Sequence, residues 1–153
     1  MGQLIMSELL HWTDALSVGI EEIDAQHKEL VRLLNQLHNV IWEKHGTVDC
    51  MEILDKLVEY TRVHFAVEES LMRILRYPDY EPHRQEHENL IAQVVELQRK
   101  LKSGEENVSF ELMRFLKNWL IRHIVGTDKA YTPYFLSKGM EKTLCKKSAW
   151  KFW

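Results

Sequence analysis

The sequence predicts an all-α protein that folds as an up-down-up-down four-helix bundle. Four stretches repeat apolar residues with a 3.6-residue period, which is typical of helices with one buried face. Short connections marked by glycine and proline separate them, and no stretch alternates like a half-buried strand. The 153 residues match the length of one ordinary domain. We therefore expect a bundle over residues 20–137, an N-terminal arm over residues 1–19 and a short C-terminal extension over residues 138–153.

Composition and charge exclude several classes of protein. The formal net charge of -3 argues against a nucleic-acid binder, and no apolar run reaches the roughly 18 residues of an integral membrane segment. The N-terminus has no basic start and is interrupted by Ser7, Glu8 and His11, so we expect no signal peptide and a cytoplasmic location. Cys50 and Cys145 lack a Cys-x-x-Cys motif and are expected to be free thiols. The largely polar outer faces of the helices favour a monomer.

The N-terminal arm and the first helix differ in periodicity. Residues 1–19 carry no helical period, and we expect Trp12 to hold this arm against the core. The first helix is expected over residues 20–45, because its apolar stripe keeps the helical period and Gly46 is a suitable stop. The stripe consists of Ile23, His27, Leu30, Val31, Leu34, Leu37, His38 and Ile41.

The second and third helices are separated by a turn that contains two prolines. Asp49 and Glu52 resemble a capping box at the start of the second helix, and Pro78 is expected to end it. Pro82 suits the first position of the third helix, and Gly104 is its expected stop. The two stripes consist of Ile53, Leu54, Leu57, Tyr60, Thr61, His64, Leu71 and Leu75, and of His83, His87, Leu90, Ile91, Val94, Leu97 and Leu101.

The fourth helix is expected to begin after a cap at Asn107 or Ser109. Its inner stripe ends near His123, and Pro133 is expected to end or kink the helix. Each of the four predicted helices therefore carries at least one histidine on its apolar stripe. The fourth stripe consists of Phe110, Met113, Leu116, Leu120, His123 and Ile124.

The C-terminal extension differs in composition from the rest of the chain. From Lys138 onward it contains five lysines and one glutamate, which gives +4 and leaves -7 for the rest of the net charge of -3. Trp150, Phe152 and Trp153 add aromatic side chains. We interpret it as a terminal segment whose aromatic residues pack on the bundle or are disordered. The alternative is weak docking to a membrane surface or a protein partner through residues 138–153.

Histidine and carboxylate pairs on the predicted helices indicate a metal site. His64 and Glu68 are four residues apart, as are His83 and His87, and this spacing places each pair on one helix face. A cluster of buried imidazoles and carboxylates without a metal would be strongly destabilising. The full set exceeds the four ligands of a zinc site and suits a pair of transition-metal ions, usually iron. The further candidate ligands are His27, His123 and Asp128.

His123 and Asp128 require a distortion of the helix that carries them. They are five residues apart, and this spacing turns by about 140° on an ideal helix. They would flank one site only if the helix were distorted between them. Gly126 lies in this interval and makes such a distortion easier.

The complete set of candidate ligands resembles the ligand pattern of the hemerythrin family, in particular its single-domain bacterial members. The pattern is His, His-x-x-x-Glu, His-x-x-x-His and His-x-x-x-x-Asp, and the similarity covers residues 10–136. The surrounding segments agree: IDAQHKEL contains His27, HFAVEE begins at His64, YPDYEPHRQEH ends at His87, and NWLIRHIVGTDKAY contains His123. A pattern of seven ligands spread over four helices is highly specific.

The resemblance implies a non-haem di-iron centre that binds molecular oxygen. Glu68 and Asp128 would bridge two iron ions, which an oxo or hydroxo group would also join. Three histidines, His83, His87 and His123, would complete the coordination of one ion. The other ion would be held by two histidines, His27 and His64, and would keep an open coordination position for oxygen.

Apolar residues next to the candidate ligands would line an oxygen pocket and keep water away from oxygen, although each also fits plain helix core. Tyr131, about one turn after Asp128, is expected to donate a hydrogen bond near the ligands or to be a core aromatic residue. His11, His38 and His45 are expected not to bind metal. The predicted pocket residues are Leu30, Phe65, Trp119, Leu120 and Ile124.

Reversible oxygen binding, as a carrier, store or sensor, is the function that the resemblance implies. The alternative is a di-iron enzyme that reduces peroxide or nitric oxide. Apart from Thr127 and the ligands, the predicted pocket offers no acid–base residue, so we expect a protein that is not an enzyme. A signalling module would normally be joined to an output domain, and a structural or storage site would not need an open iron position.

Overall fold

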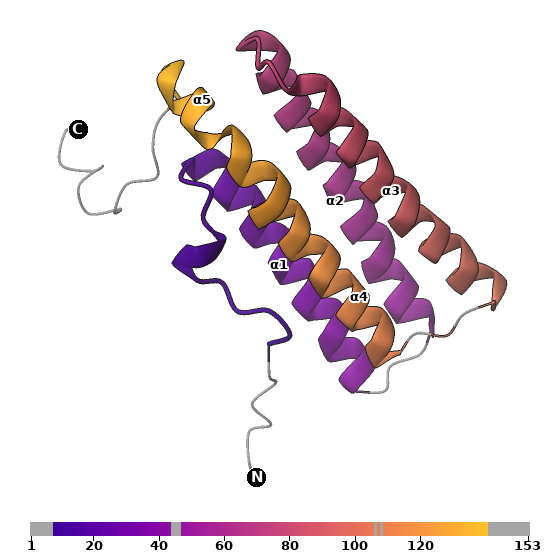
Figure 1. The fold of residues 1–153 in the computed structure, drawn as a ribbon. Coiled ribbons are helices and arrows are strands. Elements are labelled where there is room, and N and C mark those ends of the chain that lie inside the picture. The colour runs from indigo at the N-terminus through magenta and orange to yellow at the C-terminus, as the bar shows by residue number, and fades with distance from the viewer. Residues whose placement is uncertain (1–7, 44–46, 106, 108, 141–153) are drawn as a thin grey trace.

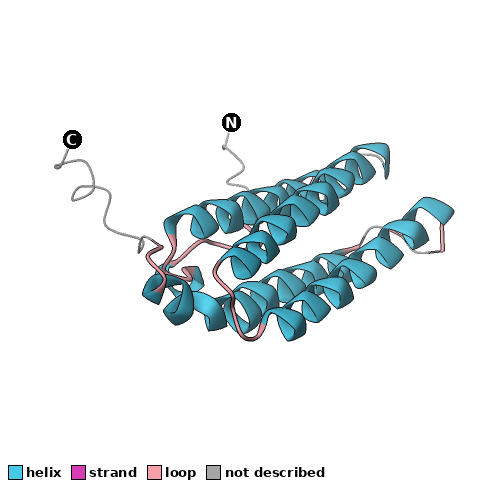
Figure 2. Ribbon diagram, turned by 90° about the horizontal axis from the view of Figure 1, so that it is seen from above, coloured by secondary structure: helices cyan, strands magenta, loops and turns pink. Residues whose placement is uncertain are grey.

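The computed structural model describes residues 8–43, 47–105, 107 and 109–140. Within this part, four long helices run side by side in alternating directions (Figure 1). Seen from above, the described chain consists of helices and loops without strands (Figure 2). The predicted all-α four-helix bundle is confirmed. The helices are α1 (Glu21–Trp42), α2 (Thr47–Ile74), α3 (Tyr80–Ser103) and α4 (Phe110–Ile121), and the chain continues through η2 (Arg122–Thr127) and η3 (Asp128–Tyr131) into α5 (Thr132–Ser137).

α1 begins and ends inside the expected range. It ends at Trp42, and residues 44–46, which include the expected stop Gly46, lie outside the described residues. Acidic side chains in the first turn suit the positive end of the helix dipole. The periodic stripe is buried from Ile23 to His38, as the sequence predicted, whereas Ile41 is only partly buried. Ile23 and Leu30 are fully inaccessible.

The end of α2 lies earlier than predicted. α2 ends at Ile74, four residues before Pro78, because Arg76 adopts a left-handed conformation with φ of 57°. The Tyr77 N–H donates to the Met72 carbonyl at 2.8 Å. This bond closes the helix as in a Schellman motif, so the reversal of the chain begins before the proline.

The starts of α2 and α3 also lie earlier than predicted. α3 begins at Tyr80, so Pro82 is its third residue rather than its first. Proline is tolerated in the first turn because those N–H groups have no partner within the helix. α2 begins at Thr47, so Asp49 lies inside its first turn rather than at the N-cap position. Gly104 follows the last residue of α3 with φ of 79°, which confirms the predicted stop.

The last long helix is capped as predicted but continues differently. Ser109, rather than Asn107, is its N-cap, because the Ser109 hydroxyl accepts from the Leu112 N–H at 3.2 Å. Regular α-helix ends at Ile121. The prediction that Pro133 ends or kinks this helix is wrong, because Pro133 stands at the start of α5, where proline is favoured.

The N-terminal arm runs beside α1 (Figure 1), and its first seven residues lie outside the described part. Trp12, the expected anchor, is only partly buried, whereas Leu16 and Val18 are buried in the core. The Asp24 carboxylate accepts from the Val18 N–H at 2.8 Å, and the Thr132 hydroxyl donates to the Val18 carbonyl. The arm is therefore held at Val18, between the start of α1 and the start of α5, and also at Leu10, whose N–H and carbonyl both bond to the Asn35 side chain.

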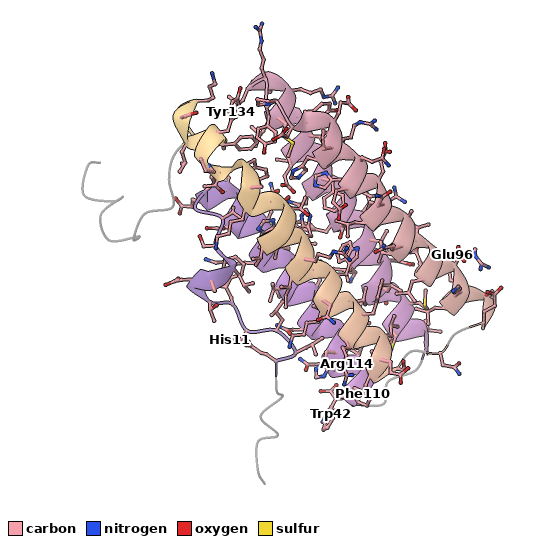
Figure 3. The ribbon with its side chains drawn as sticks, in the orientation of Figure 1. His11, Trp42, Glu96, Phe110, Arg114 and Tyr134 are labelled. Atoms are coloured by element: carbon pink, nitrogen blue, oxygen red, sulfur yellow. The ribbon has the colours of Figure 1, made fainter. Side chains whose placement is uncertain are left out.

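A cluster of aromatic rings lies at the end of the bundle where α1 ends and α4 begins. Trp42 and Phe110 lie there, at the opposite end from Tyr134 (Figure 3), and their ring centroids are 5.7 Å apart. His38 is buried beside both rings. It lies about three helical turns after His27, the other buried histidine of α1. We refer to this end, where α2 also begins and α3 ends, as the far end.

Three further expectations concern cysteines, the tail and membrane segments. Cys50 is a buried free thiol. Cys145 and the tail from residue 141 onward lie outside the described residues, as does His45. Among the described helices, none has the length and apolar character needed to cross a membrane.

Candidate metal centre

Seven buried side chains converge near the end of the bundle where α1 begins and α2 ends. α1 supplies one of them, α2 and α3 supply two each, and the segment after α4 supplies two. Each has at most 6% of its surface exposed. The structure therefore brings together every ligand candidate that the sequence indicated: His27, His64, Glu68, His83, His87, His123 and Asp128.

The turn between α2 and α3 brings their candidate ligands to one level. Glu68 lies six residues before the end of α2, and His83 and His87 lie three and seven residues after the start of α3. At ~1.5 Å per residue, all three lie within roughly 10 Å of the turn along the helix axes. Antiparallel packing then places them opposite one another.

The seven side chains form two overlapping groups. Within each group, the candidate ligand atoms all lie within 4.8 Å of one another. The carboxylates of Glu68 and Asp128 belong to both groups, so each faces both halves of the cluster. The first group adds His27, His64 and His123, and the second adds His83 and His87.

The His123 ring lies between the two groups. Its centroid is 5.3 Å from the ring of His64 and 5.3 Å from the ring of His87. Its Nε2 atom nevertheless falls in the group of His27 and lies 3.1 Å from His64 Nε2. The resemblance assigns His123 to the other ion, with His83, and that assignment stays a prediction.

Asp128 reaches both groups because the helix is distorted before it. Residues 122–127 form a π-helical turn, and the Asp128 N–H donates to the His123 carbonyl five residues earlier. The distortion that the sequence analysis required is therefore present, in a form that is common at functional sites. Asp128 Oδ2 lies 2.6 Å from His123 Nε2, and Oδ1 lies 3.0 Å from His83 Nε2.

Glu68 is the second carboxylate that faces both groups. Its Oε1 atom lies 2.5 Å from His64 Nε2 and 3.8 Å from His87 Nε2, and its Oε2 atom lies 3.9 Å from His83 Nε2. Despite these short approaches, neither oxygen accepts a hydrogen bond of good geometry from the described residues. A buried carboxylate in this position is suited to bind cations on both sides.

Burial keeps several of the histidines neutral. It lowers the pKa of His83 to about 4 and that of His87 to about 2. It also lowers the pKa of His27 well below its usual value. These rings are therefore neutral at pH 7, and neutral imidazole is the form that binds a metal ion.

The remaining charges of the site depend on one another. Burial raises the pKa of Asp128 well above its usual value, and the charge on Glu68 adds to the rise. Burial is the largest single influence on Glu68 and on His64 and disfavours charge on both. Their mutual attraction, joined by His123 for Glu68 and by Asp128 for His64, outweighs it, so the pKa of Glu68 is lowered and that of His64 is raised. Without a metal, protons on Asp128 and His64 thus supply positive charge that a bound cation would replace.

The polar atoms of the cluster fit a bound cation. His27 Nε2 lies 3.0 Å from His64 Nε2, and His83 Nε2 lies 3.1 Å from His87 Nε2, so nitrogen atoms face one another in pairs. Unpartnered buried acceptors, such as both oxygens of Glu68, are costly unless a cation binds them. Imidazole and carboxylate are ligands that divalent iron accepts.

Two contacts of the cluster were missed by the sequence analysis. The Gln26 side-chain oxygen lies 2.6 Å from His64 Nδ1, and the Glu69 carboxylate lies 3.3 Å from His87 Nδ1. The sequence positions of these two residues could have indicated the contacts, because each is adjacent to a candidate ligand. Gln26 directly precedes one on α1, and Glu69 directly follows one on α2. Glu69 and His87 also line a mainly apolar groove of about 420 Å³ between α2 and α3.

The five predicted pocket residues are all buried in the core. Phe65 stacks face to face on His87, with ring centroids 3.8 Å apart and an interplanar angle of 3°. The Trp119 indole N–H donates to the Leu90 carbonyl at 3.1 Å, so its one polar group is satisfied. That these residues line an oxygen pocket stays a prediction. The other three are Leu30, Leu120 and Ile124.

Tyr131 lies next to the cluster and is fully buried. Its ring centroid is 5.6 Å from that of His83, and the ring stacks on that of Phe135 with centroids 4.2 Å apart. Its hydroxyl has no hydrogen bond of good geometry in the described part of the chain. Burial, followed by the charges of Glu68 and Asp128, raises its pKa well above the usual value, so the phenol stays protonated.

Comparison with known proteins identifies related sequences. Residues 18–135 match the family model described as Hemerythrin HHE cation binding domain. The bacteriohemerythrin of Stenotrophomonas maltophilia (strain R551-3) is 41% identical over 123 residues, which cover 80% of this chain and 79% of that protein. The myohemerythrin of Theromyzon tessulatum is 31% identical over 124 residues, which cover 81% of this chain and 92% of that protein.

Comparison with solved structures supports the same relationship. A crystal structure of wild-type hemerythrin matches with a TM-score of 0.77 at 33% sequence identity, and the match covers 83% of this chain and 98% of that chain. The buried cluster of histidines and carboxylates agrees with a cation-binding domain. Sequence, fold and site therefore place this chain in the hemerythrin family.

Proposed function

We propose that this protein binds molecular oxygen reversibly at a pair of iron ions held by the seven buried side chains. The observation that carries the proposal is that Glu68 and Asp128 belong to both groups of candidate ligands. Two shared carboxylates suit two neighbouring ions better than one tetrahedral zinc ion. Five imidazoles against two carboxylates make the ligand set mostly neutral, which favours reversible binding over strong oxidation.

The proposed division of ligands follows the resemblance. His83, His87 and His123 would hold one ion and His27 and His64 the other, with the carboxylates of Glu68 and Asp128 shared between them. His27 and His64 would leave a position open for oxygen on the ion that they hold. When bound, the iron pair supplies the two electrons that reversible oxygen binding requires.

The protein's own contribution is to orient the ligands and keep the site dry. All seven ligand candidates are buried, and Leu30, Leu120 and Ile124 have at most 1% of their surface exposed. Apolar side chains at these positions exclude water and protons, which slows irreversible oxidation. The functional unit in this proposal is the bundle of residues 20–137, acting as a monomer without enzymatic turnover and with molecular oxygen as its ligand.

A second candidate function is supported by one observation. The Tyr131 hydroxyl is protonated, buried and without a hydrogen bond of good geometry in the described part of the chain, so it is a possible proton donor close to the cluster. A di-iron enzyme that reduces peroxide or nitric oxide would need such a donor. Leu30, Leu120 and Ile124 offer no further one, which is why we favour oxygen binding.

The proposal is tested by oxygen titration of the anaerobic di-ferrous protein with iron quantified per chain. We expect two iron ions and a visible charge-transfer band that appears with oxygen and disappears under vacuum. Irreversible bleaching with release of peroxide would contradict reversible binding. Catalytic consumption of peroxide or nitric oxide that is lost in Tyr131→Phe would establish the enzymatic alternative.

A further inference from the structure

Two residues outside the ligand set support site histidines on the neighbouring helix. Gln26 immediately precedes His27 on α1, and Glu69 immediately follows Glu68 on α2. Adjacent helical residues point about 100° apart. When His27 and Glu68 point into the cluster, Gln26 is therefore directed towards α2 and Glu69 towards α3. Each contacts one site histidine there, at 2.6 Å for Gln26 and 3.3 Å for Glu69.

The two contacts fix the orientation of His64 and His87. A carboxylate only accepts hydrogen bonds, so His87 Nδ1 must donate to Glu69. The amide oxygen of Gln26 likewise accepts from His64 Nδ1. Both rings then turn their Nε2 atoms towards the cluster, where His64 Nε2 lies 2.5 Å from Glu68 Oε1. The position of His87 is fixed further by its face-to-face stack on Phe65.

The two acceptors differ in charge. Gln26 offers a neutral amide, whereas Glu69 offers a carboxylate, and 21% of the Glu69 side chain is exposed. A carboxylate behind a metal-bound imidazole increases the basicity of the ring and strengthens it as a ligand. His27 Nδ1 and His123 Nδ1 have no hydrogen-bond partner in the described part of the chain. Of these four rings, only His87 therefore has a charged acceptor behind it.

We propose that Glu69 and Gln26 are positioning residues that make the two halves of the site electronically unequal. Glu69 strengthens His87 as a ligand, so the ion held by His87 is bound more tightly and its ferric state is favoured. Gln26 fixes His64 without adding charge, which leaves the other ion less electron-rich. This inference rests on the proposed function, because it assigns His64 and His87 to different ions.

The test exchanges charge without changing shape. Glu69→Gln keeps a hydrogen-bond acceptor behind His87 but removes its charge, and Gln26→Glu adds a charge behind His64. Glu88→Gln is the matched control, because Glu88 lines the same groove and carries the same charge. Its carboxylate pairs with Arg84 on its own helix, and 54% of its side chain is exposed.

Two quantities are measured on the full-length, iron-loaded variants: the rate of iron release to a chelator and the midpoint reduction potential. We expect Glu69→Gln to raise the potential and to release one iron ion roughly 10-fold faster. Gln26→Glu should lower the potential, and Glu88→Gln should match the unsubstituted protein in both quantities.

Three outcomes separate this inference from the proposed function. Equal behaviour of Glu69→Gln and Glu88→Gln would overturn the inference, as would potential shifts in the same direction for Glu69→Gln and Gln26→Glu. In either case an oxygen band that is still reversible would leave the proposed function intact. Opposite shifts in a protein that binds two iron ions but no oxygen would support the inference and contradict the function.

Discussion

The two ends of the bundle are built from the same helices but bury different chemistry. At the far end, the inner faces carry apolar residues such as Leu37, Leu54 and Met113. At the site end, the same inner faces carry seven ionisable side chains that are buried just as deeply. Helical periodicity places a residue on the inner face whatever its chemistry. The contribution of that residue to stability then depends on what it contacts.

This difference implies that the two ends are stabilised by different interactions. Apolar burial at the far end is favourable without any ligand, at about 25 cal/mol per Å². Buried imidazoles and carboxylates at the site end are favourable only when they bind one another or a cation. Loss of metal should therefore weaken the site end first.

The largest effect is expected from Asp128→Ala. Asp128 belongs to both groups of candidate ligands, so its removal should reduce the iron content from two ions to less than one per chain. Asp55→Ala is the control, because Asp55 is an exposed carboxylate on the far half of α2 that pairs with Lys102. Iron analysis after gel filtration measures both. Two ions in Asp128→Ala would disprove the shared role of this carboxylate.

A smaller loss is expected from His64→Ala. His64 contributes to one group only, so this variant should lose about one iron equivalent together with oxygen binding. His38→Ala serves as control, because His38 is also a buried helical histidine but lies near the far end. If His64→Ala kept two iron ions and normal oxygen binding, its assignment as a ligand would be wrong.

A substitution at the far end should affect stability without affecting iron. Leu54 is 1% exposed, and Leu54→Ala should lower the free energy of unfolding by about 2–5 kcal/mol. Iron content at 25 °C should remain at two ions per chain. Denaturant unfolding and iron analysis on the same sample measure both quantities, and a parallel loss of iron would show that the two ends are not separable.

The pH dependence of the metal-free protein should reflect the site end. The pKa of His87 is lowered to about 2 in the folded state from its usual value of 6.5, so the unfolded chain binds the extra proton first as pH falls. The contribution of His87 to the free energy of unfolding is therefore fully present above pH 6.5. Below pH 6.5 the free energy of unfolding declines by at most ~1.4 kcal/mol per pH unit because of this residue. Comparison with His87→Gln in urea isolates this residue, and a difference that is constant from pH 7 to pH 4 would contradict the prediction.

The smallest effect is expected from removal of residues 138–153. The cluster is complete without them, because its last member is Asp128. Iron content and helical circular dichroism per residue of the bundle should be unchanged in the shortened chain. A large loss of helicity would show that the extension belongs to the fold, and loss of salt-sensitive vesicle binding would support the docking alternative.

Periodicity and spacing predicted the four helices and the seven clustered residues, because both follow from local geometry. The four-residue spacing of His64 and Glu68 places them on one face in any helix. The five-residue spacing of His123 and Asp128 indicated only that a distortion was needed. Its π-helical form depends on how the helix packs, which the local sequence does not determine.

The remaining differences arise from contacts between distant segments or from unusual backbone. The early end of α2 depends on Arg76 in a left-handed conformation, for which glycine would have been the usual signal. Gln26 and Glu69 escaped notice because each contacts a histidine on another helix. The hold on the arm at Val18, in addition to the partly buried Trp12, arises because Asp24 and Thr132 bind the backbone there.

Anomalous diffraction at the iron edge from crystals of the iron-loaded protein tests the central claim most directly. That claim is that two ions share the carboxylates of Glu68 and Asp128. We predict two separate iron peaks enclosed by the seven side chains, with both carboxylates bound to both ions. A single peak, or an iron ion that contacts neither carboxylate, would contradict it.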